Sequence, residues 1–90
     1  MSRVHWLGTG LSSIPGLRKL LKKKFEIIVW NRTVEKAKKL LGDLTNNIYK
    51  FDFNELEKQT KSGDILISML PASYHIDIAN LCLRKNANFV

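Results

Sequence analysis

The sequence predicts a doubly wound α/β fold with a parallel sheet, and three observations carry this prediction. Short runs rich in β-branched and aromatic residues alternate with longer segments whose apolar residues recur at helical spacing. The first run leads into Gly8 and Gly10, as in a tight strand-to-helix turn. Residues 64–70 are almost continuously apolar, as in a central parallel strand. We therefore expect a three-layer arrangement, with helices on both faces of a sheet in strand order 3-2-1-4-5.

The predicted elements alternate along the whole chain. Thr33 and Asn54 suit helix N-caps, and Pro15 suits a first helical turn. Gly42 suits the end of a helix. The predicted strands cover residues 3–7, 25–30, 48–51, 64–70 and 88–90, and the predicted helices cover residues 11–23, 33–41, 54–61 and 74–84.

Size and composition fit one small folded domain over residues 1–90, with 44% hydrophobic residues. No apolar run approaches the roughly 20 residues of a membrane helix, and the start lacks the pattern of a signal peptide, so we expect no membrane partner. The single cysteine, Cys82, falls on an apolar helical face, which predicts a core position and fits a reducing, cytoplasmic compartment. Because the chain stops at its fifth predicted strand, we interpret it as the N-terminal part of something longer.

The net charge of +7 comes from 15 Lys and Arg against 8 Asp and Glu. Such an excess favours an anionic partner, which can be nucleic acid, a membrane surface or a small molecule. Lys22, Lys23 and Lys24 close one helical stretch and Lys36, Lys38 and Lys39 lie on another, and the aromatic residues lie in apolar runs rather than among the basic residues. This pattern favours solvated helix faces, so nucleic acid is not the expected partner.

The turn after the first strand is a candidate dinucleotide site. Gly8 permits the tight turn, Gly10 lets the backbone approach a pyrophosphate, and Ser13 occupies the small third position of the fingerprint. The hydroxyls in this turn can donate hydrogen bonds to phosphate oxygens. The predicted phosphate-binding residues are Gly8, Thr9, Gly10, Leu11, Ser12 and Ser13.

The end of the second strand indicates which dinucleotide is bound. NAD sites carry an acid about 20 positions after the glycines, which accepts a hydrogen bond from the ribose 2′-OH. Here the strand ends in Asn31, Arg32 and Thr33, and Lys36 follows. A guanidinium binds a phosphate through two parallel hydrogen bonds, and Asn31 and Thr33 offer further donors. We therefore predict NADP as the cofactor, with NAD less favoured.

Residues 68–75 follow the fourth strand, beside the carboxyl end of the first strand, where ligands of open α/β sheets bind. Tyr74 and His75 are acid–base groups by type, but a histidine in a first helical turn is more often a cap or a packing group. The acids show no paired or metal-ligand spacing, and no catalytic dyad can be assembled. The catalytic residues stay unassigned, and no metal is predicted.

Four segments together carry a resemblance to a known family: residues 8–10 with Pro15, residues 31–37, residues 51–52 and residues 67–75. The most specific parts are Arg32-Thr33 and the Ser-x-Leu-Pro-x-x-Tyr-His pattern at residues 68–75. Over essentially its whole length, the chain resembles the N-terminal Rossmann domain of the saccharopine dehydrogenase (saccharopine reductase) family. Ser13 and Ala72 depart from the residues usual in that family.

The resemblance implies an NAD(P)-dependent oxidoreductase of lysine metabolism, which transfers hydride at the C–N bond of an imine or secondary amine derived from an amino acid. It implies contacts to the pyrophosphate from residues 9–13, to the 2′-phosphate from Arg32 and Thr33, to the adenine from Asp52, and to the nicotinamide ribose from Leu70 and Pro71. The residues that bind an amino-acid or oxo-acid substrate, and a homodimer interface, would belong to a later C-terminal domain. We expect the present chain alone to be inactive.

Three alternatives stay open at this point. The Asn-Arg-Thr run at residues 31–33 is also similar to NADP-dependent β-hydroxyacid dehydrogenases and imine reductases. The same fold also serves non-catalytic modules that sense a dinucleotide. A basic nucleic-acid-binding domain is the third alternative and has the least support.

Overall fold

The structure, a computed structural model, describes residues 3–8, 14–23 and 26–90. Its sheet contains five parallel strands in the order β3-β2-β1-β4-β5, so the predicted fold class and strand order are confirmed. The strands are β1 (Val4–Leu7), β2 (Ile27–Asn31), β3 (Ile48–Lys50), β4 (Ile65–Ser68) and β5 (Asn88–Phe89). The helices are α1 (Ile14–Lys22), α2 (Val34–Leu41), α3 (Phe53–Gln59) and α4 (His75–Lys85), and a short 3₁₀ helix, η2 (Ala72–Tyr74), precedes α4.

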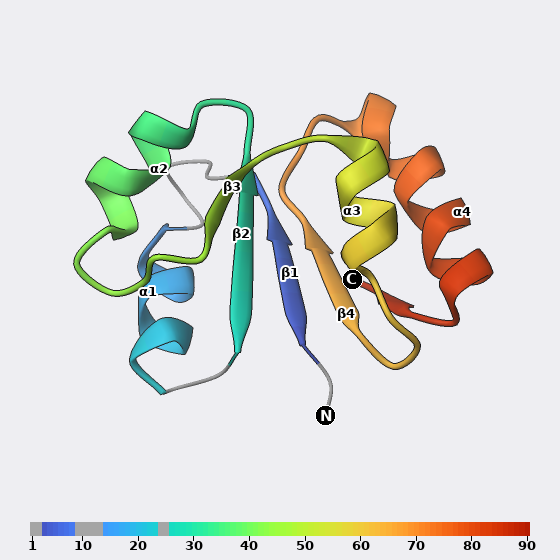
Figure 1. The fold of residues 1–90 in the computed structure, drawn as a ribbon, viewed down its shortest axis with the longest axis horizontal. Helices are drawn as coiled ribbons and strands as arrows, with labels where there is room; N and C mark the ends of the chain where they lie inside the picture. The colour runs from blue at the N-terminus through green and yellow to red at the C-terminus, as the bar shows by residue number, and fades with distance from the viewer. Residues whose placement is uncertain (1–2, 9–13, 24–25) are drawn as a thin grey trace.

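The helices form two layers, with α1 and α2 on one side of the sheet and α3 and α4 on the other (Figure 1). Successive residues of a strand face opposite layers, so β1 sends Trp6 into the core under α1 and α2 and Leu7 into the core under α3 and α4. Cys82 belongs to the second core, which confirms its predicted burial. β1 is covered on both faces, which explains its apolar residues Val4, Trp6 and Leu7, and its one polar residue, His5, is fully buried as well.

Several element boundaries differ from those predicted. The structure starts α3 at Phe53 with Asp52 as its N-cap, so the prediction of Asn54 as the cap is wrong. The Oδ1 atom of Asp52 accepts hydrogen bonds from the backbone N–H groups of Asn54 at 2.9 Å and Glu55 at 3.3 Å, which is the usual reason for aspartate at this position. The fourth strand covers Ile65–Ser68 and is shorter than predicted at both ends: Asp64 precedes it and accepts from the backbone N–H groups of Arg3 and Lys61, and Met69 and Leu70 belong to the loop that follows it.

Candidate functional site

A hollow of about 210 Å³ lies at the carboxyl-terminal edge of the sheet, where β1, β2 and β4 end side by side. Ligands of open parallel sheets bind at this edge, next to the point where the strand order reverses. The residues that line the hollow are Gly8, Asn31, Arg32, Lys36, Met69, Leu70 and Pro71. Five of them were predicted as cofactor-binding residues, whereas Lys36 was considered only as a source of positive charge and Met69 was missed.

Gly8 follows β1 and lies against the backbone of Met69, just after the end of β4. Its φ of +92° lies in the region that favours glycine, and a Cβ atom there would lie 3.1 Å from the carbonyl oxygen of Met69. Two hydrogen bonds of 2.7 Å hold this arrangement, from the N–H of Gly8 to the carbonyl of Trp30 and from the N–H of Met69 to the carbonyl of Leu7. The packing of the strand ends therefore requires glycine at this position. Because glycine has no side chain, it also leaves the hollow that it lines free at this point.

The rest of the predicted phosphate-binding turn lies outside the described residues. These residues are Thr9, Gly10, Leu11, Ser12 and Ser13. Their contacts to a pyrophosphate stay a prediction from the sequence.

The turn between β2 and α2 brings Arg32 to the hollow. The side-chain amide of Asn31 donates a hydrogen bond of 2.8 Å to the carbonyl oxygen of Thr33, which also accepts the first hydrogen bond of α2 from the N–H of Ala37 at 3.3 Å. The carbonyl of Asn31 in turn accepts from the N–H of Phe51 at 2.8 Å. Asn31 therefore shapes the turn that carries Arg32, in addition to lining the hollow.

The N-terminus of α2 receives no hydrogen bond from the side chain of its own N-cap residue. Thr33 is the N-cap residue, as predicted, but its side chain makes no cap hydrogen bond, in contrast to Asp52 at the start of α3. The first N–H groups of a helix carry partial positive charge and need an acceptor from outside the helix. Two exposed cations, Arg32 and Lys36, flank this end, together with one acid, Glu35. Uncapped N–H groups with a guanidinium and an ammonium beside them fit a phosphate.

Asp52 has a structural contact of its own, because its Oδ1 atom caps α3. The side chain is exposed, at the loop that follows β3. The contact to an adenine that the family resemblance implies stays a prediction.

Leu70 and Pro71 line the opposite side of the hollow from the β2–α2 turn, in the loop after β4. This loop is held by short-range hydrogen bonds. The N–H of Tyr74 donates to the carbonyl of Pro71 at 3.0 Å, and Nε2 of His75 lies 3.1 Å from the carbonyl oxygen of Leu70. Because a carbonyl oxygen only accepts, Nε2 of His75 is the donor in that contact.

The two candidate acid–base side chains, Tyr74 and His75, both pack against aromatic neighbours. The ring of Tyr74 meets Phe51 edge-on with centroids 5.8 Å apart, and the ring of His75 meets Phe89 with centroids 6.1 Å apart. These contacts, with the hydrogen bond to Leu70, support the interpretation of His75 as a packing and loop-holding residue.

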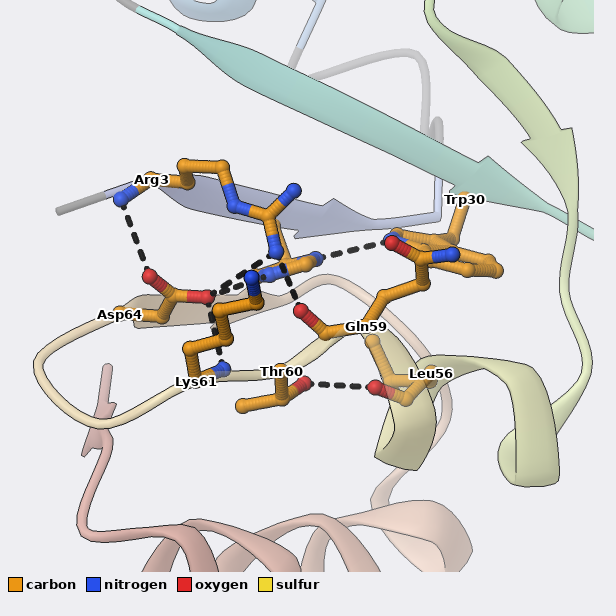
Figure 2. A network of polar contacts seen from close by, with 8 residues as sticks. Arg3, Trp30, Leu56, Gln59, Thr60, Lys61 and Asp64 are labelled. Atoms are coloured by element: carbon orange, nitrogen blue, oxygen red, sulfur yellow. Dashed lines mark hydrogen bonds and ion pairs between the residues drawn. The ribbon is translucent and has the colours of Figure 1, made fainter. Parts of the chain in front are cut away.

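A buried polar network that sequence reasoning missed joins β1, β2 and the turn before β4 (Figure 2). Nε1 of Trp30 donates to Nδ1 of His5 at 3.1 Å, and Nε2 of His5 lies 3.0 Å from Oδ2 of Asp64. Because Trp30 can only donate, Nδ1 of His5 accepts and Nε2 carries the proton that it donates to Asp64. Oδ1 of Asp64 also accepts from the backbone N–H of Arg3 at 3.1 Å, and Oδ2 from the backbone N–H of Lys61 at 2.9 Å.

Burial and hydrogen bonding set the charge states in this network. Burial is the largest influence on His5 and lowers its pKa below 6.5, against the opposing effect of Asp64. Burial alone would raise the pKa of Asp64, but the hydrogen bonds from the backbone N–H groups of Lys61 and Arg3 and from His5 lower it below 3.8. His5 is 0% exposed and Asp64 precedes β4, so this pair lies in the core at the edge of the sheet opposite the hollow.

A second hollow, of about 290 Å³, lies on the face of β2 beside α3. Its floor includes Ile28 and Trp30, and its rim mixes both signs of charge, with Arg3 and Lys50 against Glu26 and Glu55. The first hollow is lined by the strand-end glycine Gly8 and by the cations Arg32 and Lys36, with no acid among its lining residues, so it is the candidate nucleotide site.

The fold and the first hollow together define a dinucleotide-binding domain. Residues 4–90 match the family model of the saccharopine dehydrogenase NADP binding domain, and the chain belongs to that family. The resemblance stated from the sequence is therefore confirmed, and the chain is a dinucleotide-binding module of an oxidoreductase family. A comparison with curated proteins gives no match. Within the described ranges 3–8, 14–23 and 26–90, no helix is both long and apolar enough to cross a membrane.

Proposed function

We propose that this chain binds NADP in preference to NAD, as the cofactor domain of a longer oxidoreductase that acts on a C–N bond. The observation that supports this most directly is that two cations, Arg32 and Lys36, both line the hollow at the N-terminus of α2, where the side chain of Thr33 makes no cap hydrogen bond. Residues 31–33 at the end of β2 include no carboxylate, so the acid that accepts from the ribose 2′-OH in NAD sites, and that would repel a 2′-phosphate, is missing from this turn.

The proposed binding mode runs along the carboxyl edge of the sheet. Gly8 and residues 9–13 receive the pyrophosphate, and Arg32 and Thr33 receive the 2′-phosphate. Asn31 holds the turn between them through its bond to Thr33. Asp52 lies on the adenine side of the site, and Leu70 and Pro71 lie on the nicotinamide side.

When bound, the nicotinamide would supply the hydride, and this chain would bind and orient it. In the full enzyme the acceptor would be the carbon of an imine formed from an amino acid, or the reverse reaction would oxidise a secondary amine. We propose that substrate-binding and catalytic residues belong to another part of that enzyme, so the present chain binds cofactor without turnover.

The test compares thermal unfolding of the chain with NADPH and with NADH. A ligand that binds only the native state at 100 times its Kd stabilises it by about 2.7 kcal/mol, and each kcal/mol raises the Tm of a domain of this size by roughly 4–8 °C. We expect the larger rise with NADPH. Equal rises would refute the NADP preference, and no rise with either dinucleotide would refute cofactor binding by this chain.

An Arg32→Ala variant locates the preference. A hydrogen bond to a charged group contributes about 1.5–3 kcal/mol, so the variant should lose roughly tenfold or more in affinity for NADPH and almost nothing for NADH. Arg84→Ala is a matched control, because Arg84 is an exposed arginine of α4 that pairs with Glu57 at 2.7 Å. If Arg32→Ala weakens both dinucleotides equally, Arg32 has a structural role instead.

A further inference from the structure

The charge of the molecule is divided unevenly between the two helical layers. The α1–α2 layer, taken as residues 14–23 and 33–43, contains six exposed lysines: Lys19, Lys22, Lys23, Lys36, Lys38 and Lys39. Its remaining cation, Arg18, pairs with Asp43 at 2.8 Å, which leaves Glu35 as the other acid of these two segments. Most of the net charge of +7 is therefore carried by this layer.

The α3–α4 layer, taken as residues 52–61 and 75–85, is balanced. It contains four acids and four bases. Two pairs are in contact, Glu55 with Lys58 at 3.6 Å and Glu57 with Arg84 at 2.7 Å. Because the sheet separates the layers (Figure 1), the excess of basic residues in these segments lies on one side of the sheet.

Lys36 connects the basic layer to the hollow, because it belongs to α2 and also lines the hollow beside Arg32. Lys38 and Lys39 follow it along the same helix. We propose that the α1–α2 layer is an electrostatic steering surface for the polyanionic dinucleotide, which it draws toward the hollow before any direct contact forms. This inference rests on the proposed NADP binding and adds how the cofactor arrives.

Steering differs from binding in its dependence on salt. Charges act over about 30 Å at 0.01 M ionic strength but only about 8 Å at 0.15 M. At low salt the whole layer should therefore contribute to the association rate, including Lys19 and Lys22 toward the far end of α1. At physiological salt only the lysines of α2 should contribute, because α2 begins at the hollow.

The surface chemistry of the layer favours a transient attraction over a stable complex. The large apolar side chains exposed in the described part of the chain all lie outside these two segments, at Tyr49, Met69, Ile76, Leu83, Phe89 and Val90. A protein or nucleic acid bound to the surface of α1 and α2 would contact charged side chains, but no exposed aromatic or large apolar side chains of these two segments. Attraction of a small anion that then moves into the hollow fits that composition.

The experiment measures association and dissociation rates of NADPH by stopped-flow fluorescence at about 0.01, 0.15 and 0.5 M ionic strength. Three variants remove the same charge from different places: Lys38→Gln/Lys39→Gln on α2, Lys19→Gln/Lys22→Gln on α1, and Lys58→Gln/Lys85→Gln on the α3–α4 layer as the matched control. Unfolding curves verify that all three fold.

We expect the α2 variant to associate roughly threefold more slowly at the lowest salt, with an unchanged dissociation rate. The α1 variant should show a smaller loss that disappears at about 0.15 M, and the control should stay close to the wild type. An equal loss in all three variants would show an effect of net charge alone and overturn the inference. Unchanged association rates in the α2 variant would overturn it as well, while NADPH binding itself would still stand.

Two further outcomes are informative. If the wild type does not bind NADPH at any salt, the proposed function and the steering both fail. If the α2 variant keeps the association rate for NADPH but loses binding to a short DNA duplex that the wild type binds, the layer is a nucleic-acid surface and steering is overturned.

Discussion

Replacement of Trp30 by phenylalanine should destabilise the fold more than the same replacement at Trp6. The two indoles are similarly buried, with exposed fractions of 2% and 5%, so both variants lose a similar amount of packed ring. They differ in their polar contacts. Nε1 of Trp30 donates to His5 at 3.1 Å, whereas Nε1 of Trp6 has no partner among the residues that the structure describes.

The difference between the two variants isolates one hydrogen bond. In Trp30→Phe, Nδ1 of His5 loses its donor and stays buried, and an unsatisfied buried acceptor costs about 1–3 kcal/mol. Trp6→Phe removes a donor that has no partner within the described residues, so we expect no such penalty for it. We therefore expect the free energy of unfolding to fall by about 1–3 kcal/mol more in Trp30→Phe, which corresponds to several degrees in Tm for a domain of this size.

Urea unfolding followed by far-ultraviolet circular dichroism measures this difference without relying on tryptophan fluorescence. The m-values of the two variants should agree with that of the wild type, because the surface exposed on unfolding barely changes. A loss in Trp6→Phe as large as that in Trp30→Phe would refute the argument. It would mean that the hydrogen bond to His5 contributes nothing beyond the packing of the indole.

Three other predictions concern the turn, the buried histidine and the β2–α2 loop. Gly8→Ala should lower the free energy of unfolding by more than about 1 kcal/mol, because the φ of +92° and the carbonyl oxygen of Met69 both oppose a Cβ atom. The control is Gly16→Ala in α1, where nothing lies within 4 Å of the new carbon. Thermal unfolding should show this control to be neutral or stabilising. Burial lowers the pKa of His5 below 6.5, so the unfolded chain binds the proton more readily than the folded chain does. The contribution of His5 to stability should therefore be complete above about pH 6.5 and fall as the pH drops below it. His5→Asn should flatten this dependence on pH in urea unfolding at about pH 7.5, 6.5 and 5.5. Asn31→Ala should raise the Kd of NADPH roughly fivefold in a fluorescence titration, because the hydrogen bond from Asn31 to Thr33 contributes about 1 kcal/mol to the shape of the turn. The control variant Asn80→Ala, at an exposed position of α4, should leave the Kd unchanged.

The strand order and layers could be predicted because they follow from periodicity and from general rules of parallel sheets. Alternating strand and helix patterns leave few topologies once crossovers are right-handed. Boundaries were less accurate where side chains compete for the same role. Asp52 and Asn54 are both good N-caps, and which one caps α3 is decided by the extended backbone of Asp52, with φ −143° and ψ 119°, which the sequence does not reveal.

The buried His5–Asp64 pair could not be predicted from spacing, because 59 positions separate the two residues. Their contact exists only because β1 and β4 are neighbours in the sheet, with Val4 opposite Ile65. The strand order that the sequence predicts places the start of β4 beside β1, and Asp64, the residue before β4, therefore lies near His5. The hydrogen bond from the Asn31 side-chain amide to the carbonyl of Thr33 does not follow from the strand order, because it depends on the local shape of the two-residue turn between β2 and α2.

Trp30 connects the stability of the fold to the candidate site. Its indole is held by His5 in the core, and its carbonyl accepts the N–H of Gly8 at 2.7 Å, so the end of β2 is fixed from both sides just before the turn begins. Arg32 and Lys36 project from that fixed frame and are themselves exposed. Changes at Gly8 or Trp30 should therefore lower stability and cofactor affinity together, whereas changes at Arg32 should alter selectivity with little effect on unfolding. The proposed preference for NADP would thus depend on surface charges carried by a fixed strand end, so substitutions should be able to alter it without a change in the fold.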